Sequence, residues 1–140
     1  MSDNFKIIAQ FVKDISSETP NIETYFYVRE FLKNYSLNIN ITSAPLKNRM
    51  IEINTQLTYS DKGTPKNKSY FEIIYTSVVQ IAESIKEKKI IEKIVLCDVQ
   101  KEIYPKLEKI FINLLNDSGY PGVKFEKKLD FEQLYNQKLN

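Results

Sequence analysis

The chain has 140 residues, of which 42% are hydrophobic and 27% charged, and its formal net charge is +2. This length and composition predict one globular domain spanning residues 1–140. The near-neutral charge, with only Arg29 and Arg49 as arginines among twenty cationic residues, argues against a nucleic-acid-binding surface. No apolar run approaches the roughly 20 residues that cross a bilayer, so no direct membrane insertion is expected.

The residue types that are missing exclude several kinds of active site. The chain has no histidine, one cysteine (Cys97) and three glycines. It therefore cannot build a Ser-His-Asp triad, a histidine-based zinc site or a cluster of thiolates. The scattered glycines do not form a phosphate-binding loop. We expect no enzyme activity, no metal and no cofactor. The single cysteine and the polar start "MSDNF" favour a cytoplasmic protein without a signal peptide.

The first 81 residues contain four segments in which apolar and polar residues alternate, which predicts β-strands. In the first, "NFKIIAQF", one face carries Phe5, Ile7, Ala9 and Phe11, continued by Ile15. Asp14 then lies in the opposite phase, and Glu18 follows the end of the strand. The other strands are expected at 36–43, 50–60 and 69–81, the last two joined by a hairpin loop, "DKGTPKNK". One apolar and one wet face per strand is typical of an antiparallel sheet.

The connector at residues 21–35 is rich in aromatic residues, although connectors are usually polar. Two compatible interpretations remain open. The segment could be an amphipathic turn or helix that closes one end of the core. It could also offer an apolar surface to another chain. The aromatic residues concerned are Tyr25, Phe26, Tyr27, Phe31 and Tyr35.

After residue 81 the apolar residues recur at helical spacing. Ser84 and Glu87 match a capping box, which predicts a helix start. Pro105 predicts a break between two long helices. Gly119 ends the second helix, and Asp130 with Gln133 predicts the cap of a short last helix. The two long stripes consist of Ile90, Ile91, Ile94, Val95 and Cys97, and of Leu107, Ile110, Phe111, Leu114 and Leu115. The expected fold is α+β: a four-stranded antiparallel sheet with one face covered by two long helices and a short C-terminal helix.

Three motifs resemble those of the SecB family of protein-export chaperones. "KDISSETPN" at 13–21 resembles the family's first-strand motif, and Tyr104–Pro105 resembles the aromatic–proline pair of its main helix. "SGYP" and "KLDFEQLY" resemble its C-terminal motifs. The order of the expected elements is also that of the family.

The resemblance implies an ATP-independent holdase that binds unfolded precursor proteins in the cytoplasm and delivers them to the SecA ATPase. It implies a homotetramer, built as a dimer of dimers, with apolar grooves that hold the client. By motif position, Asp14, Glu18 and Glu72 would dock SecA, and Tyr70 would occupy the place of an apolar contact. The connector aromatics Tyr25, Phe26, Tyr27 and Phe31 are our candidates for the client-binding groove.

Two other interpretations remain open. A SecB-like chaperone could serve a single partner, such as an antitoxin, instead of general export. An α+β domain could also bind a small ligand or act as an enzyme. A deep closed cavity with converging carboxylates would favour that last interpretation over an open groove.

Overall fold

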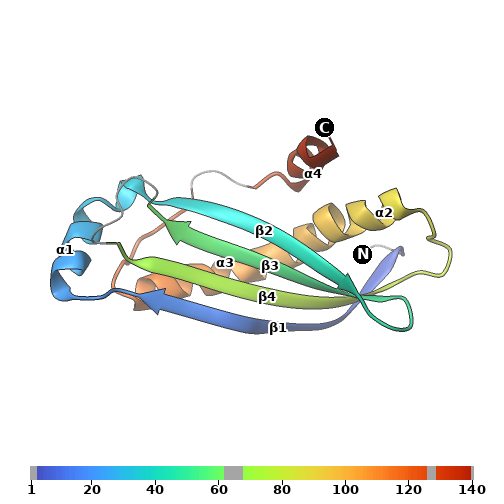
Figure 1. Cartoon of the computed structure of the whole chain (residues 1–140), viewed down its shortest axis with the longest axis horizontal. Helices are drawn as coiled ribbons and strands as arrows, with labels where there is room; N and C mark the ends of the chain where they lie inside the picture. Colours follow the sequence, from blue (N-terminus) through green and yellow to red (C-terminus); the bar gives the residue numbers. More distant parts are fainter. Residues whose placement is uncertain (1–2, 62–67, 126–128, 140) are drawn as a thin grey trace.

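The computed structural model describes residues 3–61, 68–125 and 129–139. Its strands form one antiparallel sheet in the order β1-β4-β3-β2, and the long helical rod lies across one face of that sheet (Figure 1). In chain order the elements are β1 (Phe5–Glu18), α1 (Ile22–Glu30), the 3₁₀ turn η1 (Leu32–Asn34), β2 (Ser36–Pro45), β3 (Met50–Ser60), β4 (Tyr70–Ile81), α2 (Lys88–Lys93), the π-helical turn η2 (Ile94–Asp98), α3 (Val99–Asp117) and α4 (Phe131–Leu139). The expected α+β fold is confirmed.

The sheet buries its inner face because β3 and β4 present rows to the helices that are apolar except at Thr55 and Ser77. The side chains of Ile53, Leu57, Phe71 and Ile73 are completely buried there. Strands β2, β3 and β4 begin and end within two residues of the predicted bounds. The predicted loop between β3 and β4 covers residues 61–68, of which residues 62–67 lie outside the described residues.

Strand β1 corrects the sequence prediction in two ways. It includes Glu18 as its last residue, whereas Glu18 was expected to follow the end of the strand. Its pairing with β4 also skips at Ile8 and at Lys13. A bulge of this kind reverses which face the following side chains occupy. Ala9 and Phe11 therefore face outward with Asp14, instead of inward with Phe5 and Ile7 as predicted.

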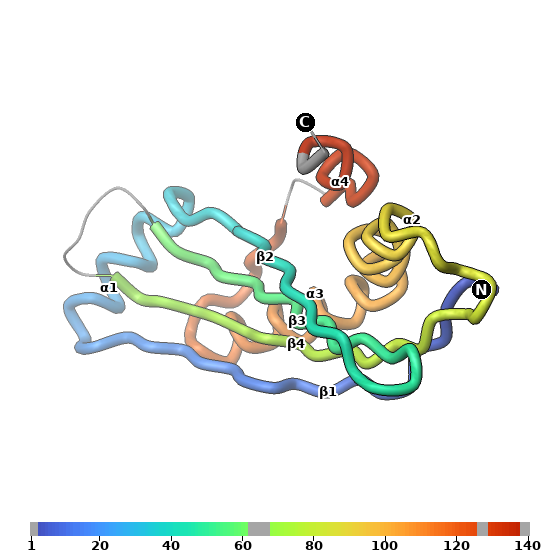
Figure 2. The backbone as a smooth tube through the Cα atoms, turned by 45° about the vertical axis from the view of Figure 1, so that its right-hand side comes forward, coloured from blue at the N-terminus to red at the C-terminus, as the bar shows by residue number. Residues whose placement is uncertain are grey.

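The helical layer is one rod rather than two long helices (Figure 2). Pro105 lies inside α3, where it costs about 3 kcal/mol by removing a hydrogen bond and crowding the preceding turn. The flanking side chains Ile103, Tyr104 and Leu107 are all buried. Each contributes roughly 1.5–3 kcal/mol on burial, which outweighs the cost of the proline.

The start of the rod also differs from the prediction, because α2 begins at Lys88 and no side chain caps it.

The π-helical turn η2 is fixed to the sheet by a buried glutamine. The Val99 N–H donates to the carbonyl of Ile94, five residues back, so it does not bond the carbonyl of Val95 as it would in an α-helix. Instead, Gln100 Nε2 donates to the Val95 carbonyl at 3.3 Å. The hydroxyl of Thr55 on β3 donates to Gln100 Oε1 at 3.0 Å. Gln100 is 0% exposed, so these bonds satisfy a polar group in the core.

Candidate functional site

The four residues predicted to dock a partner lie together on the outer face of the sheet, near one end of β1 and β4. Glu18 pairs directly with Tyr70, and Asp14 pairs with Ile74. Glu72 is opposite Ser16, between these two pairs. Residues directly opposite each other in antiparallel strands point to the same face. Asp14, Glu18, Tyr70 and Glu72 therefore form one surface, which we call the outer acidic patch.

Neighbouring side chains hold part of the outer acidic patch in place. The Tyr70 hydroxyl donates to Glu72 Oε1 at 3.2 Å, and the Gln56 amide donates to the same oxygen. Partial burial raises the pKa of Tyr70, and the charges of Glu72 and Glu18 raise it further. Tyr70 therefore stays a neutral hydrogen-bond donor at neutral pH. The hydrogen bonds from Tyr70 and Gln56 thus fix the position of the Glu72 carboxylate. The sequence did not reveal these contacts.

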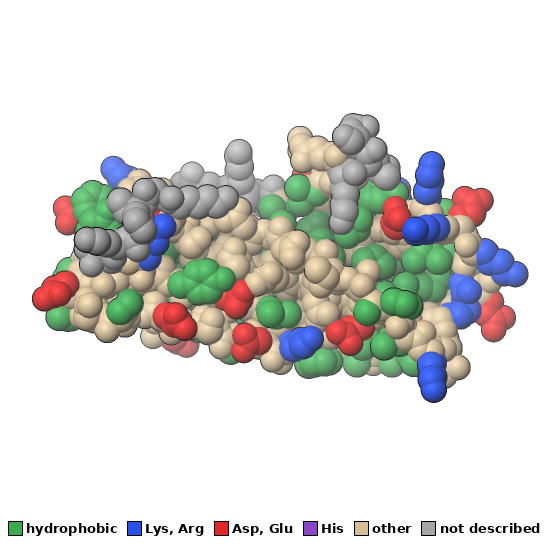
Figure 3. All heavy atoms as spheres, viewed as in Figure 1, with side chains coloured by type: hydrophobic (Ala, Val, Ile, Leu, Met, Phe, Trp, Pro, Cys, Tyr) green, Lys and Arg blue, Asp and Glu red, His purple; other side chains and the backbone are tan. Residues whose placement is uncertain are grey.

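An aromatic side chain that the sequence placed in the core lies on the outer face. Phe11 pairs with Thr76, next to the pair of Asp14 and Ile74, and is 49% exposed. The first bulge in β1 puts it there. The same face is otherwise mostly polar and uncharged, with acidic side chains over β4 and β1 (Figure 3). An exposed phenylalanine beside carboxylates combines an apolar and an ionic contact for a protein partner.

The four connector aromatics predicted to bind clients belong to α1 and its end, which close one end of the sheet. Asn21 caps α1 by accepting the Thr24 N–H at 2.8 Å. The Tyr25 hydroxyl donates to the Gly119 carbonyl at 2.8 Å. The rings of Tyr27 and Phe31 pack against each other at 4.7 Å. Phe26 alone among the four is mainly exposed, at 57%.

These contacts support the packing interpretation of the connector. The grooves described next are lined by other residues, and a role in client binding stays a prediction.

An apolar groove follows the inner face of the edge strand β2. One wall is formed by the half-buried side chains of Leu37, Ile39 and Ile41 on β2. The other wall comes from the helical rod, from α4 and from the segment before α4: Ile91, Leu96, Phe125, Leu129, Leu134 and Tyr135. Three adjoining hollows of about 440, 210 and 660 Å³ follow one another from the Leu37 end to the Pro45 end of the strand. We call this surface the β2 groove.

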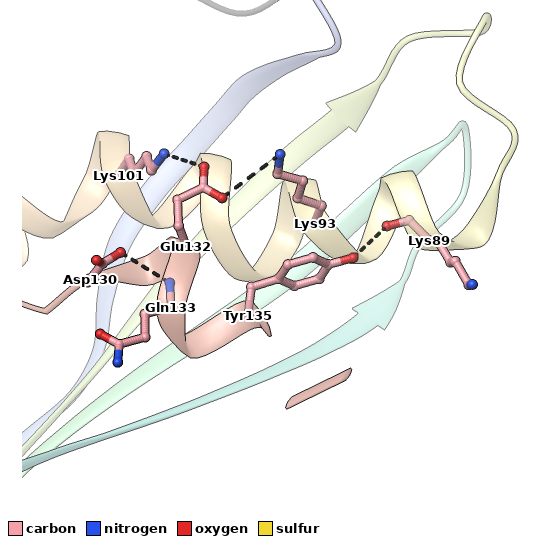
Figure 4. Close-up of polar contacts among 7 residues, drawn as sticks. All are labelled: Lys89, Lys93, Lys101, Asp130, Glu132, Gln133 and Tyr135. Carbon is pink, nitrogen blue, oxygen red and sulfur yellow. Dashed lines mark hydrogen bonds and ion pairs between the residues drawn. The ribbon is translucent and has the colours of Figure 1, made fainter. Parts of the chain in front are cut away.

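Helix α4 forms part of the groove because polar contacts dock it onto the rod (Figure 4). The predicted cap is present, with the Gln133 N–H donating to Asp130 Oδ1 at 3.1 Å. The Tyr135 hydroxyl donates to the Lys89 carbonyl at 3.2 Å. Glu132 accepts from Lys101 Nζ at 2.7 Å, and this bond lowers the pKa of its carboxyl.

One cluster offers ligand atoms of the kinds that bind metals. The thiol of Cys97 and the carboxylates of Asp98 and Glu132 lie within 4.8 Å of one another. Burial raises the pKa of the Cys97 thiol, and a hydrogen bond to Glu132 adds to this. A protonated thiol is a poor metal ligand. Glu132 is already bound by Lys101, so the cluster is better explained as part of the α4 contact.

Sequence reasoning found the strand face that carries Leu37, Ile39 and Ile41 but missed its role as a groove wall. The position of β2 at the edge of the sheet leaves these side chains half covered. Edge position depends on strand order, which alternation alone does not reveal. Among the described residues, no helix is long and apolar enough to cross a membrane.

Comparisons with known proteins identify the family. The whole chain, residues 1–140, matches the family described as preprotein translocase subunit SecB. A relative from Pelagibacter ubique (strain HTCC1062), provisionally named a protein-export protein SecB, is 55% identical over 140 residues, 100% of both chains. The protein-export protein SecB of Mesorhizobium japonicum is 24% identical over 97% of this chain and 80% of its own.

Among solved structures, a SecB-like chaperone of Mycobacterium tuberculosis, in complex with a peptide from an antitoxin, has the same fold. Its TM-score is 0.65 at 8% identity, covering 90% of this chain and 88% of that one. The likeness in fold agrees with the match over the full sequence. The chain belongs to the SecB family.

Proposed function

We propose that this chain is an ATP-independent holdase that binds unfolded precursor proteins in the cytoplasm and delivers them to the SecA motor. Membership of the SecB family, a chaperone family rather than an enzyme family, supports a role in protein export. The β2 groove is the observation that carries the holding step. Ten residues of β2, at roughly 3.3 Å each, give it a length of about 30 Å.

The chemistry of the groove suits clients of many sequences. Its walls are mainly aliphatic and aromatic, and burial of apolar area is favourable whatever the direction of approach. The side chains of β2 that line the groove are only half-buried, so the groove is open to solvent. It is not a closed cavity with converging carboxylates. A small-ligand site or an active site is therefore less well supported than a surface for extended chains.

Suppression of aggregation tests the holding step. The chaperone should delay aggregation of a chemically unfolded reporter protein equally with and without ATP. Replacing Ile39 and Ile41 by serine should weaken client binding by about 1–3 kcal/mol, the scale for losing burial of two partly covered side chains. Replacing Ile74 and Val78, equally half-buried on the outer face, provides the matched control. Equal loss in both variants would remove the groove from the proposal.

Delivery is assigned to the outer acidic patch. Its carboxylates suit a basic segment of SecA, because charge complementarity orients and speeds encounter. Changing Asp14, Glu18 and Glu72 to the neutral amides should leave folding within about 0.5 kcal/mol, as is usual for surface positions. SecA binding should weaken strongly at low salt while client holding persists. Unchanged SecA affinity would mean that the patch only solubilises the sheet.

The proposed assembly is a homotetramer, a dimer of dimers. Val12 and Ile15 on β1 pair with Tyr75 and Ile73, so they point to the inner side of the sheet. They are nevertheless 40% and 42% exposed. Uncovered inward apolar side chains on an edge strand support burial against a second copy.

A chaperone dedicated to one partner is the alternative. The fold shared with the mycobacterial SecB-like chaperone, whose structure contains an antitoxin peptide, favours it specifically. Capture of bound proteins from the native cell distinguishes the two functions. Many unfolded precursors would support general export, whereas one small partner at stoichiometric amounts would support the dedicated function.

A further inference from the structure

The two ends of the β2 groove carry an excess of positive charge. Lys33 and Lys124 line it where β2 begins. Lys86 and Lys88 line it where β2 ends, together with a single acidic residue, Glu92. The groove thus has four lysines against one glutamate, although the whole chain is nearly balanced at 20 cationic and 18 acidic residues. Basic side chains also gather at the α2 end of the molecule in Figure 3.

None of these four lysines forms an ion pair with another described residue. The three salt bridges among the described residues involve other lysines: Lys13 with Glu52, and Lys93 and Lys101 with Glu132. The groove lysines can therefore contact a ligand without breaking an ion pair to another described residue. Between the two ends, Ile39, Ile41 and Leu96 line the central part of the groove, together with helix α4. Asn40 also lines this part, and its side chain is polar but uncharged.

We infer that the β2 groove selects extended apolar segments flanked on both sides by acidic residues. The inference rests on the proposed holding function and specifies its client. The basic ends lie about 30 Å apart, since β2 rises roughly 3.3 Å per residue. An extended client therefore needs acidic positions about eight to ten residues apart, with an apolar core between them. Basic flanks would meet like charges at both ends.

The expected selectivity is modest and depends on salt. An exposed lysine–carboxylate pair changes affinity by up to about fivefold. Two pairs acting together should separate acidic from neutral flanks by roughly three- to tenfold at low salt. Screening shortens the reach of such pairs to about 8 Å at physiological ionic strength. The preference should therefore shrink as salt rises, while binding of the apolar core remains.

Three fluorescent peptides with one shared eight-residue apolar core, which places the innermost flanking residues nine positions apart, test the inference by fluorescence anisotropy. Their flanks are two glutamates, two glutamines or two lysines at each end. The parent chaperone should bind the glutamate-flanked peptide most tightly and the lysine-flanked peptide most weakly. Equal affinities, or the opposite order, would overturn the inference even if every peptide binds. If no peptide binds and aggregation is not suppressed, the proposed holding function fails as well.

Charge-reversal variants locate the preference in the groove. Lys33→Glu with Lys88→Glu changes the lining from four lysines and one glutamate to two lysines and three glutamates, so the preference for acidic flanks should be lost or weakly reversed. Lys6→Glu with Lys47→Glu makes the same change in net charge outside the groove and should keep the order. If the reversal variant does not fold, Lys33→Gln with Lys88→Gln should weaken the preference. A preference unchanged by the groove variants, or reversed by the control, would overturn the inference.

Discussion

Replacing Gln100 by leucine tests whether the π-helical turn depends on its side chain. Leucine keeps most of the volume, so the cavity contribution is small. It leaves two buried groups without their partner: the Thr55 hydroxyl and the Val95 carbonyl. Each orphaned group costs about 1–3 kcal/mol, so Gln100→Leu should lower the free energy of unfolding by roughly 2–6 kcal/mol. Chemical denaturation at a fixed protein concentration measures this change.

A double-mutant cycle isolates the bond between the two side chains. Thr55→Val alone orphans Gln100 Oε1, whereas in the double variant neither side of that bond remains polar. The double variant should therefore be less unstable than the sum of the single variants, by about 1 kcal/mol or more. Ser77→Ala is the control, because the buried Ser77 hydroxyl has no hydrogen-bond partner among the described residues. It should be neutral or stabilising. Additive costs at residues 55 and 100 would refute the reasoning.

The same variant connects the core to the groove. Val95 and Leu96 belong to the π-helical turn and line the β2 groove. If Gln100 sets the shape of this turn, Gln100→Leu should also weaken binding of an apolar peptide per folded molecule, measured well below the melting temperature. Instability with unchanged peptide affinity would limit Gln100 to the core.

Three further predictions concern the edge strand β1, the turn after α3 and helix α4. Val12→Asp with Ile15→Asp should keep a folded chain but lower its native mass, and an unchanged mass would exclude β1 from the assembly contact. Gly119→Ala should destabilise, because φ is +105° and the new Cβ would lie 2.7 Å from the Tyr25 ring; a neutral result by thermal melting would contradict this. Glu132 has a lowered pKa, so its contribution to stability is complete above the ordinary glutamate pKa and is lost as pH falls through the lowered value. The melting temperatures of the parent and Glu132→Gln should therefore differ at neutral pH and converge in acid.

The strands were predictable because their burial is regular. In β4, and in β3 from Ile53 onward, every second residue is buried against the helices, and alternation alone locates Ile53, Leu57 and Ile73 correctly. Pro105 was interpreted as a break because local propensity was weighed without the burial around it, and tertiary packing overrode it. The missing cap at Ser84 is a similar case, since a four-residue motif does not determine where a helix begins.

The outward placement of Asp14 and Glu72 was predicted correctly although the phase of β1 was wrong in its middle, and their role in docking SecA stays a prediction. The bulge at Ile8 turns Phe11 outward, and the bulge at Lys13 restores the original phase before Asp14. Two insertions of one residue cancel, so residues on either side of the pair keep their expected faces. Only the segment between the bulges is inverted. Ile8 and Lys13 interrupt the alternation, but such an interruption does not by itself show that the strand bulges there, so the sequence could not place Phe11 beside the carboxylates.

Because of the strand order, the two proposed surfaces lie on opposite faces and opposite edges of the sheet. The patch lies on the outer face over β1 and β4, and the groove follows β2 on the inner face, at the opposite edge of the sheet. Three strand spacings of about 4.8 Å separate β1 from β2. On the proposed assignments, a client along β2 would leave the patch open, and we expect a loaded chaperone still to dock SecA. We expect a saturating groove peptide to leave SecA affinity unchanged when both are titrated in one solution. Competition between them would show that the two partners share a surface.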